Sequence, residues 1–228
     1  MQLKLVKAYF DQFTTYLEST QNEDWLYLWE SQRIFQENWD LEATDLTTMY
    51  DASLNNSKTR RLWTREAYEP KKMMLKFLEL QSEFVRSMFK DLYKESISLS
   101  GRVGRFVFYC DELLNTHEEL NPKSRDTNHY HDDGYQMISL YLAFRYPDQY
   151  TLYNRDAFKK TLKKLGVSDL PLADDLERYA KVSTTLFKLM QKEPKLMELH
   201  QNRLKEGEHY LEESLLVVYE FYRFCEKN

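Results

Sequence analysis

Hydrophobic residues recur every three or four positions along most of the chain, the spacing that places them on one face of an α-helix. Near the start, apolar side chains stand at positions 3, 6, 10, 13 and 17. The same spacing predicts further helices over about 23–35, 46–54, 70–92, 103–114, 134–146, 155–165, 172–190 and 204–225. Only residues 150–153 favour a brief strand. We therefore expect an all-α fold, an irregular bundle of about eight to ten helices with at most one brief strand.

Polar residues, proline and glycine mark the ends of these helices. Asn22, Asp133 and Asn154 are each placed as helix N-caps, and Pro70 fits the first turn of a long helix. Gly166 fits a C-terminal stop. Between the helices we expect an exposed connection over 55–69, a loop over 96–101 and a polar, turn-rich stretch over 115–133.

Composition narrows the class of protein. The 228 residues suit one helical domain over 1–228, and five glycines and five prolines are too few for a sheet with many tight turns. The first five residues lack the apolar run of a signal peptide, and no window approaches eighteen apolar residues in a row, so we expect a cytoplasmic protein without a membrane partner. The two cysteines, Cys110 and Cys225, stand among apolar residues, so we expect buried thiols and no disulfide.

Charge is distributed unevenly along the chain. Residues 1–57 carry three Lys/Arg against ten Asp/Glu, a net charge of −7, whereas residues 58–105 carry twelve against six, a net charge of +6. Within the basic part, arginines and lysines alternate with aromatic residues. Guanidinium and ammonium groups bind phosphates, and exposed aromatic rings stack on bases. The nucleic-acid-binding residues that we predict are Arg60, Arg61, Trp63, Arg65, Tyr68, Lys71, Lys72 and Lys76. The structural alternative is a solvated face whose arginines pair with the acidic first segment.

One other string contains groups that bind metals, His129, His131, Asp132 and Asp133. Residues two apart on a helix point in different directions, and ligands three or four apart would be expected there. His117 and Asp111 have no flanking pattern that would complete a site. We therefore interpret the string as a polar loop that leads into a helix, and we predict no metal ligand, no cofactor and no catalytic residue. A metal-dependent phosphohydrolase or nuclease centred on these four residues is the alternative.

Four segments resemble a known family. They are RRLWTREAYEPKKMMLKF (60–77), FVRSMF (84–89), GRVGRFVFYCDELL (101–114) and SLYLAFRYPDQY (139–150). Together they resemble the helical region that precedes the motor in McrB-type AAA+ ATPases, relatives of the methylcytosine-specific restriction GTPase of bacterial phage defence. The resemblance spans about residues 39–166. With the charge pattern, it suggests a chain made of an acidic helical start (1–57), a basic and aromatic core like the family (58–166) and a C-terminal helical pair (167–228).

The resemblance implies a recognition or assembly module that works with an AAA+ motor, and this sequence contains no Walker motif of its own. We therefore expect a non-enzymatic module of an anti-phage restriction system. Its expected partners are nucleic acid, specifically DNA, or an AAA+ motor domain or subunit, and a homo-oligomer is compatible with the sequence. A purely structural adaptor between proteins, which docks its acidic first helices on a basic partner, is the second alternative.

Overall fold

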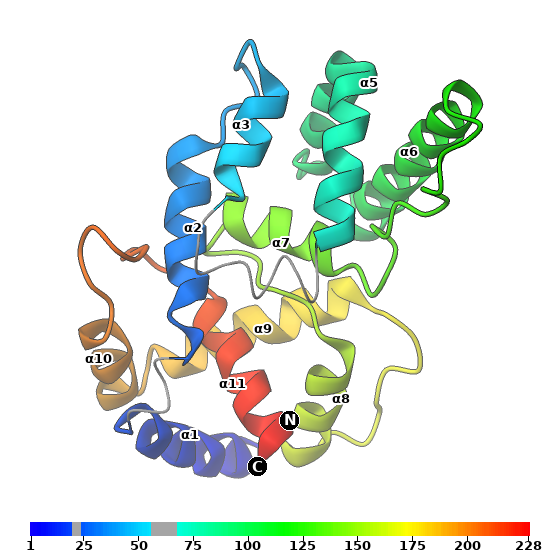
Figure 1. Ribbon diagram of the computed structural model, residues 1–228. Helices are drawn as coiled ribbons and strands as arrows, with labels where there is room; N and C mark the ends of the chain where they lie inside the picture. The colour runs from blue at the N-terminus through cyan, green and yellow to red at the C-terminus, as the bar shows by residue number, and fades with distance from the viewer. Residues whose placement is uncertain (20–23, 56–67) are drawn as a thin grey trace. The chain divides into compact units, whose positions relative to one another are not determined.

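The computed structural model describes residues 1–19, 24–55 and 68–228, and helix is the only regular secondary structure in these ranges (Figure 1). The predicted all-α fold is thereby confirmed. No strand occurs in the described ranges, and residues 150–153 are irregular. The ten helices of these ranges are α1 (Leu3–Leu17), α2 (Tyr27–Asn38), α3 (Leu46–Ser53), α5 (Tyr68–Leu92), α6 (Leu99–Leu120), α7 (Gln136–Arg145), α8 (Arg155–Lys164), α9 (Leu176–Met190), α10 (Pro194–Asn202) and α11 (Leu216–Lys227).

Contacts between Cα atoms divide the chain into two compact units. Unit 1 consists of Met1–Arg33 and Leu142–Asn228, and unit 2 consists of Ile34–Tyr141. Helices α2 and α7 each contribute residues to both units. Over the described residues, no helix combines the length and the apolar character needed to cross a membrane.

Unit 1 is built around α11, which packs on α8, α9 and α1, while α10 contacts α1 and α9. Aromatic rings fill its centre. Phe10 and Phe13 of α1 meet Phe221 of α11 edge to face, with ring centroids 5.2 and 5.4 Å apart. Tyr222 packs in the same way on Phe158 of α8. Edge-to-face pairs of buried rings stabilise a core beyond the area that they bury.

Unit 2 is organised by α5, which lies against α6 and α3 (Figure 1). Its core is also aromatic. Phe89 of α5 contacts Trp39, Tyr141 and Phe106, with ring centroids 5.0 to 5.3 Å apart. The hydroxyl groups of Tyr50 and Tyr141 lie 2.6 Å apart in the same cluster. Unit 2 therefore contains both candidate sites, one around Cys110 of α6 and one around Lys76 of α5.

Several predicted helix ends are confirmed by their capping geometry. Asn154 caps α8, because its side chain accepts a hydrogen bond from the backbone N–H of Ala157 at 2.9 Å. Gly166 ends the same helix with φ +73°, a conformation that glycine adopts without strain. The range of α1 matches the predicted first helix. Helix α7 ends at Arg145, two residues before Pro147, as expected for a residue that cannot continue a helix.

Other predicted ends were wrong in the first half of the chain. Trp25 lies in a 3₁₀ turn ahead of α2, which begins only at Tyr27, while the predicted cap Asn22 lies outside the described residues. Helix α6 begins at Leu99, inside the expected loop, because Ser98 caps it by accepting from the Gly101 N–H. The same helix continues to Leu120, since polar residues occupy its solvent face there. Helix α5 contains a break at Gln81, where φ is −146° and ψ is 67°.

The second half of the chain departs from prediction at three loops. Asp133 is no N-cap, because Gly134 and Tyr135 both adopt positive φ and α7 starts at Gln136. Leu172 is 89% exposed and precedes α9. The single predicted helix over 204–225 is interrupted by a connection in which Gly207 has φ +75°. Leu204 and Leu211 lie in that connection, and only α11 follows it.

Candidate functional site

The predicted nucleic-acid-binding residues fall partly outside the described chain. Tyr68 is the first residue of α5, and the structure describes the side chains of Lys71, Lys72 and Lys76 along the first turns of that helix. The side chain of Tyr68 is not among the described ones. The remaining predicted residues, Arg60, Arg61, Trp63 and Arg65, lie outside the described residues.

All three described lysines contact carboxylates. The Nζ of Lys71 lies 2.7 Å from Asp51 Oδ1, in the acidic first segment. The Nζ of Lys72 lies 3.6 Å from Glu69 and 3.9 Å from Asp126. The ammonium of Lys76 also bonds Asp126. The alternative to nucleic-acid binding was a solvated face whose arginines pair with the acidic first segment. The pairing of Lys71 with Asp51 is a contact of that kind, but it is made by a lysine.

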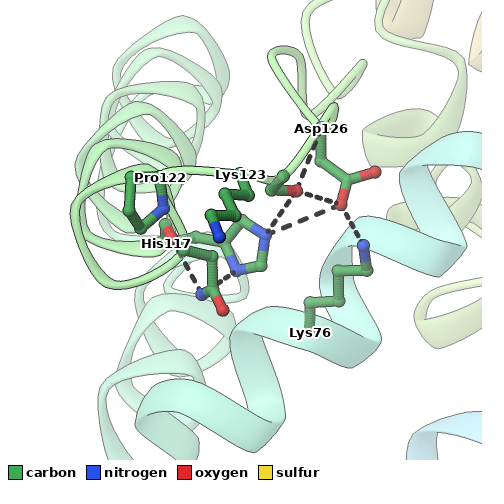
Figure 2. Close-up of a pocket in the computed structure, with 7 residues that line it drawn as sticks. Lys76, His117, Pro122, Lys123 and Asp126 are labelled. Atoms are coloured by element: carbon green, nitrogen blue, oxygen red, sulfur yellow. Dashed lines mark hydrogen bonds and ion pairs between the residues drawn. The ribbon is translucent and has the colours of Figure 1, made fainter.

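Lys76 also lines a surface pocket of about 390 Å³ in unit 2, whose lining residues are polar except for Pro122 (Figure 2). Helix α6 contributes His117 from its last turn, and the segment that follows α6 contributes the other lining residues apart from Lys76. The lining residues are Lys76, His117, Asn121, Pro122, Lys123, Ser124 and Asp126. Lys76 thus shares the pocket with a second lysine, Lys123, which comes from a different segment of the chain.

Asp126 is the hub of hydrogen bonding in this pocket. Its carboxylate accepts from Lys76 and, at 2.8 Å, from the hydroxyl of Ser124, and His117 Nε2 lies 3.6 Å away. The bond from Lys76, followed by that from Ser124, lowers the pKa of Asp126 to about 2. The carboxylate is therefore charged at neutral pH and cancels one of the two lysine charges. The sequence contained no periodic signal for Asp126 or His117, because both belong to the stretch interpreted only as polar and turn-rich.

The histidine string is a second candidate, and its burial differs from the prediction. His129 is 3% exposed and His131 0% exposed, so they are no part of a solvated polar loop. Their segment is not helical, and Tyr130 between them has φ +61°. The backbone N–H of His131 donates to His129 Nδ1 at 3.0 Å, and His131 Nδ1 lies 2.9 Å from the carbonyl oxygen of His129. The argument from helical spacing therefore does not apply to this pair.

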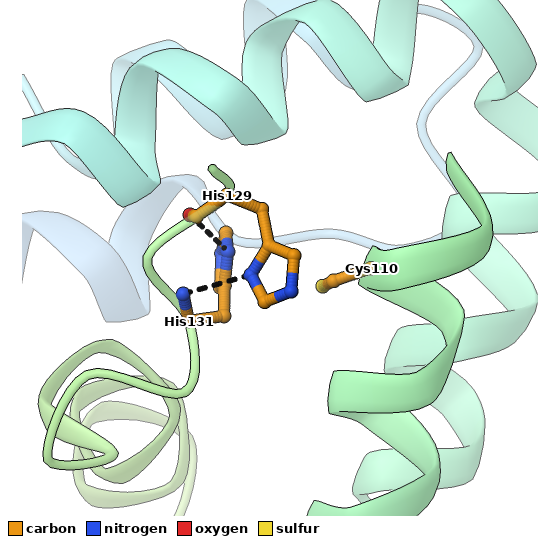
Figure 3. A group of neighbouring side chains, drawn as sticks. All are labelled: Cys110, His129 and His131. Atoms are coloured by element: carbon orange, nitrogen blue, oxygen red, sulfur yellow. Dashed lines mark hydrogen bonds between the residues drawn. The ribbon is translucent and has the colours of Figure 1, made fainter. Parts of the chain in front are cut away.

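The side chain of Cys110, on α6, lies close to the two histidines (Figure 3). One ligand atom of each of the three residues lies within 4.8 Å of the other two. Asp111 contacts the edge of this group, with Oδ1 3.0 Å from His129 Nε2, but does not belong to it. Of the four residues in the hydrolase alternative, the structure brings together only His129 and His131. Asp132 and Asp133 are exposed and belong to no ligand group found over the described residues.

Burial controls the protonation of this cluster. Desolvation raises the pKa of the Cys110 thiol well above its usual value, and the charges of Asp111 and Asp132 raise it further. Desolvation also lowers the pKa of His131 to about 3, with a smaller contribution from His129. A neutral buried thiol is a poor nucleophile. Both cysteines are free and buried, as predicted.

Comparison with known proteins assigns the chain to no family. No family model, no curated protein and no solved structure matches the chain.

Proposed function

We propose that this chain is a non-enzymatic recognition or assembly module that binds nucleic acid through its basic stretch, residues 60–76, and the polar pocket that Lys76 lines. The observation that carries the proposal is the position of Lys76. This predicted phosphate ligand shares the pocket with Lys123, which the chain brings there from a segment about fifty residues away. Two ammonium groups from separate elements can contact the same phosphate or two successive phosphates of a nucleic-acid strand.

Glu69 beside Lys72 competes only weakly with a phosphate, whereas Asp126 beside Lys76 is the stronger competitor, since the side chains of that pair are 28% and 21% exposed. Lys72 and its partner Glu69 have side chains that are 44% and 46% exposed. Ion pairs at such exposed positions contribute only about 0–1 kcal/mol and weaken with salt. A phosphate carries a full charge and several acceptor oxygens, so it can replace a surface carboxylate as the partner of a lysine. The local net charge of +6 over residues 58–105 favours that exchange.

The resemblance of residues 39–166 to McrB-type ATPases supports a place in a restriction system of phage defence. In such a system the module recognises DNA or assembles with a partner, and an AAA+ motor, as another domain or subunit, hydrolyses the nucleotide. This chain supplies no Walker motif, so the motor is the partner in this proposal.

One observation favours the protein adaptor as a second candidate. Lys71, Lys72 and Lys76 each contact at least one carboxylate of this chain, so the described part of the basic stretch is already neutralised in the free protein. In the adaptor, these pairs stabilise the fold, and the remaining acidic surface of residues 1–57 docks on a basic partner.

Fluorescence anisotropy with labelled duplex and single-stranded DNA, from low to physiological salt, separates the two candidates. We expect salt-sensitive binding of the wild type, and a plot of log K against log salt that is flatter by about 1.8 in the double variant Lys76→Ala/Lys123→Ala, about 0.9 for each lost phosphate contact. The control Lys159→Ala/Lys163→Ala removes two lysines from α8 in unit 1 and should keep the wild-type slope. Absence of binding at the lowest salt would contradict nucleic-acid recognition and leave the adaptor.

A further inference from the structure

The buried cluster of Cys110, His129 and His131 has the composition of a zinc site. Cysteine sulfur and imidazole nitrogen are the ligands that structural zinc sites use, in groups of four at the corners of a tetrahedron. Magnesium and calcium instead require oxygen ligands. Because α6 supplies Cys110 and the segment before α7 supplies both histidines, a metal here would join two separate parts of unit 2 (Figure 3). We propose that unit 2 binds one zinc ion through Cys110, His129 and His131, with Asp111 beside the site as a hydrogen-bond partner of His129.

The spacing of the donor atoms suits a small cation. Bond lengths of about 2.0–2.3 Å place neighbouring ligand atoms of a tetrahedral zinc about 3.3–3.6 Å apart. The three ligand atoms here lie within 4.8 Å of one another, so they need to approach by no more than about 1.5 Å. The side chains have to rotate to make this shift when the metal binds.

His131 is already oriented as a metal ligand. Its Nδ1 lies 2.9 Å from the carbonyl oxygen of His129 and donates to it, which leaves the lone pair of Nε2 available. Histidines that bind metals characteristically donate their other N–H to a carbonyl or carboxylate in this way. The hydroxyl of Tyr141 lies 3.4 Å from Nε2, and that hydroxyl also bonds Tyr50. A metal on Nε2 therefore leaves the Tyr141 hydroxyl with a partner.

Asp111 lies at the exposed edge of the cluster, with a side chain that is 58% exposed. Its Oδ1 lies 3.0 Å from His129 Nε2 and accepts the Nε2 proton, since His129 Nδ1 accepts from the His131 N–H. A zinc ion on His129 therefore replaces one of these two hydrogen bonds. The Cys110 thiolate and the nearby Asp111 carboxylate together bring two negative charges, which balance Zn²⁺, and a neutral assembly is what a buried position requires.

The burial of Cys110 favours a role as a metal ligand over a role as a catalytic nucleophile. Cys110 is 0% exposed, so a Cys–His nucleophile would have no access to a substrate, whereas a metal ion can be bound while the chain folds. The zinc would hold the segment 121–135, which contains no helix, against α6. This site is independent of the proposed nucleic-acid function, and its test uses no nucleic acid.

The test begins with the metal content of the full chain, purified without chelators after expression with added zinc. We expect one zinc per chain by mass spectrometry, and a thiolate-to-cobalt charge-transfer band after exchange for Co²⁺. Cys110→Ser and His131→Gln should each remove stoichiometric zinc. Asp111→Asn should keep the metal but bind it about 10- to 100-fold more weakly. Cys225→Ser is the matched control, because it makes the same substitution at the other buried cysteine, in unit 1, and should keep one zinc per chain.

The wild type alone can overturn the proposal, so the test does not depend on folding of the variants. If the wild-type chain contains no stoichiometric zinc, takes up none on titration and gives no thiolate band with Co²⁺, there is no site. Equal loss of zinc in Cys225→Ser and Cys110→Ser would also contradict it, since the metal would then follow general stability and not these ligands.

Discussion

Arg203 and Glu220 form an ion pair in the interior of unit 1. Glu220, on α11, is 0% exposed, and both terminal nitrogens of the Arg203 guanidinium donate to its carboxylate, one of them at 2.8 Å. The same guanidinium lies over the ring of Trp29, 5.0 Å from its centroid. A buried pair of this kind stabilises the fold only while both charges are present, because either charge alone remains in a region of low polarity.

The first prediction follows from that pair. Glu220→Gln should lower the free energy of unfolding by about 3–5 kcal/mol, because it leaves the Arg203 charge buried without its carboxylate. Urea unfolding followed by circular dichroism measures the change. Glu18→Gln is the matched control in the same unit, since Glu18 and its partner Lys195 have side chains that are 44% and 70% exposed, and it should cost less than about 1 kcal/mol. Equal effects of the two substitutions would contradict this view of Glu220.

His200 gives the second prediction, a dependence of stability on pH. It is 5% exposed, and Arg203 Nη2 donates to its Nδ1 at 3.1 Å. Desolvation, and then the charge of Arg203, hold the pKa of His200 well below its usual 6.5. The folded state therefore stays neutral while the unfolded state takes up a proton below about pH 6.5. The stability from this group is complete above that pH and decreases as the pH falls below it.

For one histidine the decrease amounts to about 1.4 kcal/mol per pH unit, or about 2 kcal/mol between pH 6.5 and 5. His200→Gln keeps an acceptor for Arg203 but cannot be protonated, so it should lose less stability than the wild type over this interval by about that amount. Urea unfolding of both proteins at pH 7 and pH 5 measures the difference. The same loss in both proteins would show that His200 does not remain neutral.

The third prediction concerns the hydroxyl pair of Tyr50 and Tyr141 in unit 2. The two oxygens lie 2.6 Å apart and both residues are 0% exposed. Tyr50→Phe should lower the free energy of unfolding by about 1–3 kcal/mol, because Tyr141 loses its closest hydrogen-bond partner in the interior. In the double variant Tyr50→Phe/Tyr141→Phe, the cost should be clearly less than the sum of the single changes. A double-mutant cycle by urea unfolding measures this coupling, and additive costs would contradict it.

Asp126 provides the fourth prediction, on the pocket. The hydrogen bond from Lys76 is the largest cause of its pKa of about 2, so Lys76→Ala should raise that pKa toward the usual 3.8. Because the folded-state pKa is the lower one, the interaction stabilises the protein above about pH 4 and is lost as the pH falls from there toward 2. Carboxyl resonances in an NMR titration report the pKa directly. Lys123→Ala is the control, and a larger shift there than in Lys76→Ala would contradict the assignment.

The helices were largely predictable from the sequence, and the loops and buried polar groups were not. Apolar spacing located α1 and α8, because one hydrophobic face against a core is a local property of the chain. Leu172, in contrast, has the same apolar character as Leu176, yet it is exposed ahead of the Asp175 cap of α9. Nothing in spacing alone distinguishes an apolar residue of a loop from one in a helix.

The cluster around Cys110 escaped prediction for a different reason. Its histidines were judged by the geometry of a helix, whereas Tyr130 takes a positive φ and the segment turns. Cys110 was interpreted as an ordinary core thiol, correctly as far as its burial is concerned. Only the path of residues 121–135 back along α6 brings His129 within hydrogen-bond distance of Asp111, and such a long-range approach leaves no periodic signal in the sequence.

The last prediction separates the two chemistries that we propose for the basic stretch. Arg60 and Arg61 are expected to neutralise phosphates, and each neutralised phosphate of a duplex releases counterions. Arg60→Ala/Arg61→Ala should therefore flatten the plot of log K against log salt by about 2.

Trp63 is expected to stack on a base, which releases no counterions. Trp63→Ala should weaken binding of single-stranded DNA by about 1–3 kcal/mol and keep the slope. Anisotropy titrations at several salt concentrations measure both quantities. A change of slope in Trp63→Ala, or an unchanged slope in the arginine variant, would contradict this division of roles, and loss of folding stability in the arginine variant would instead indicate that these arginines pair with carboxylates of the chain.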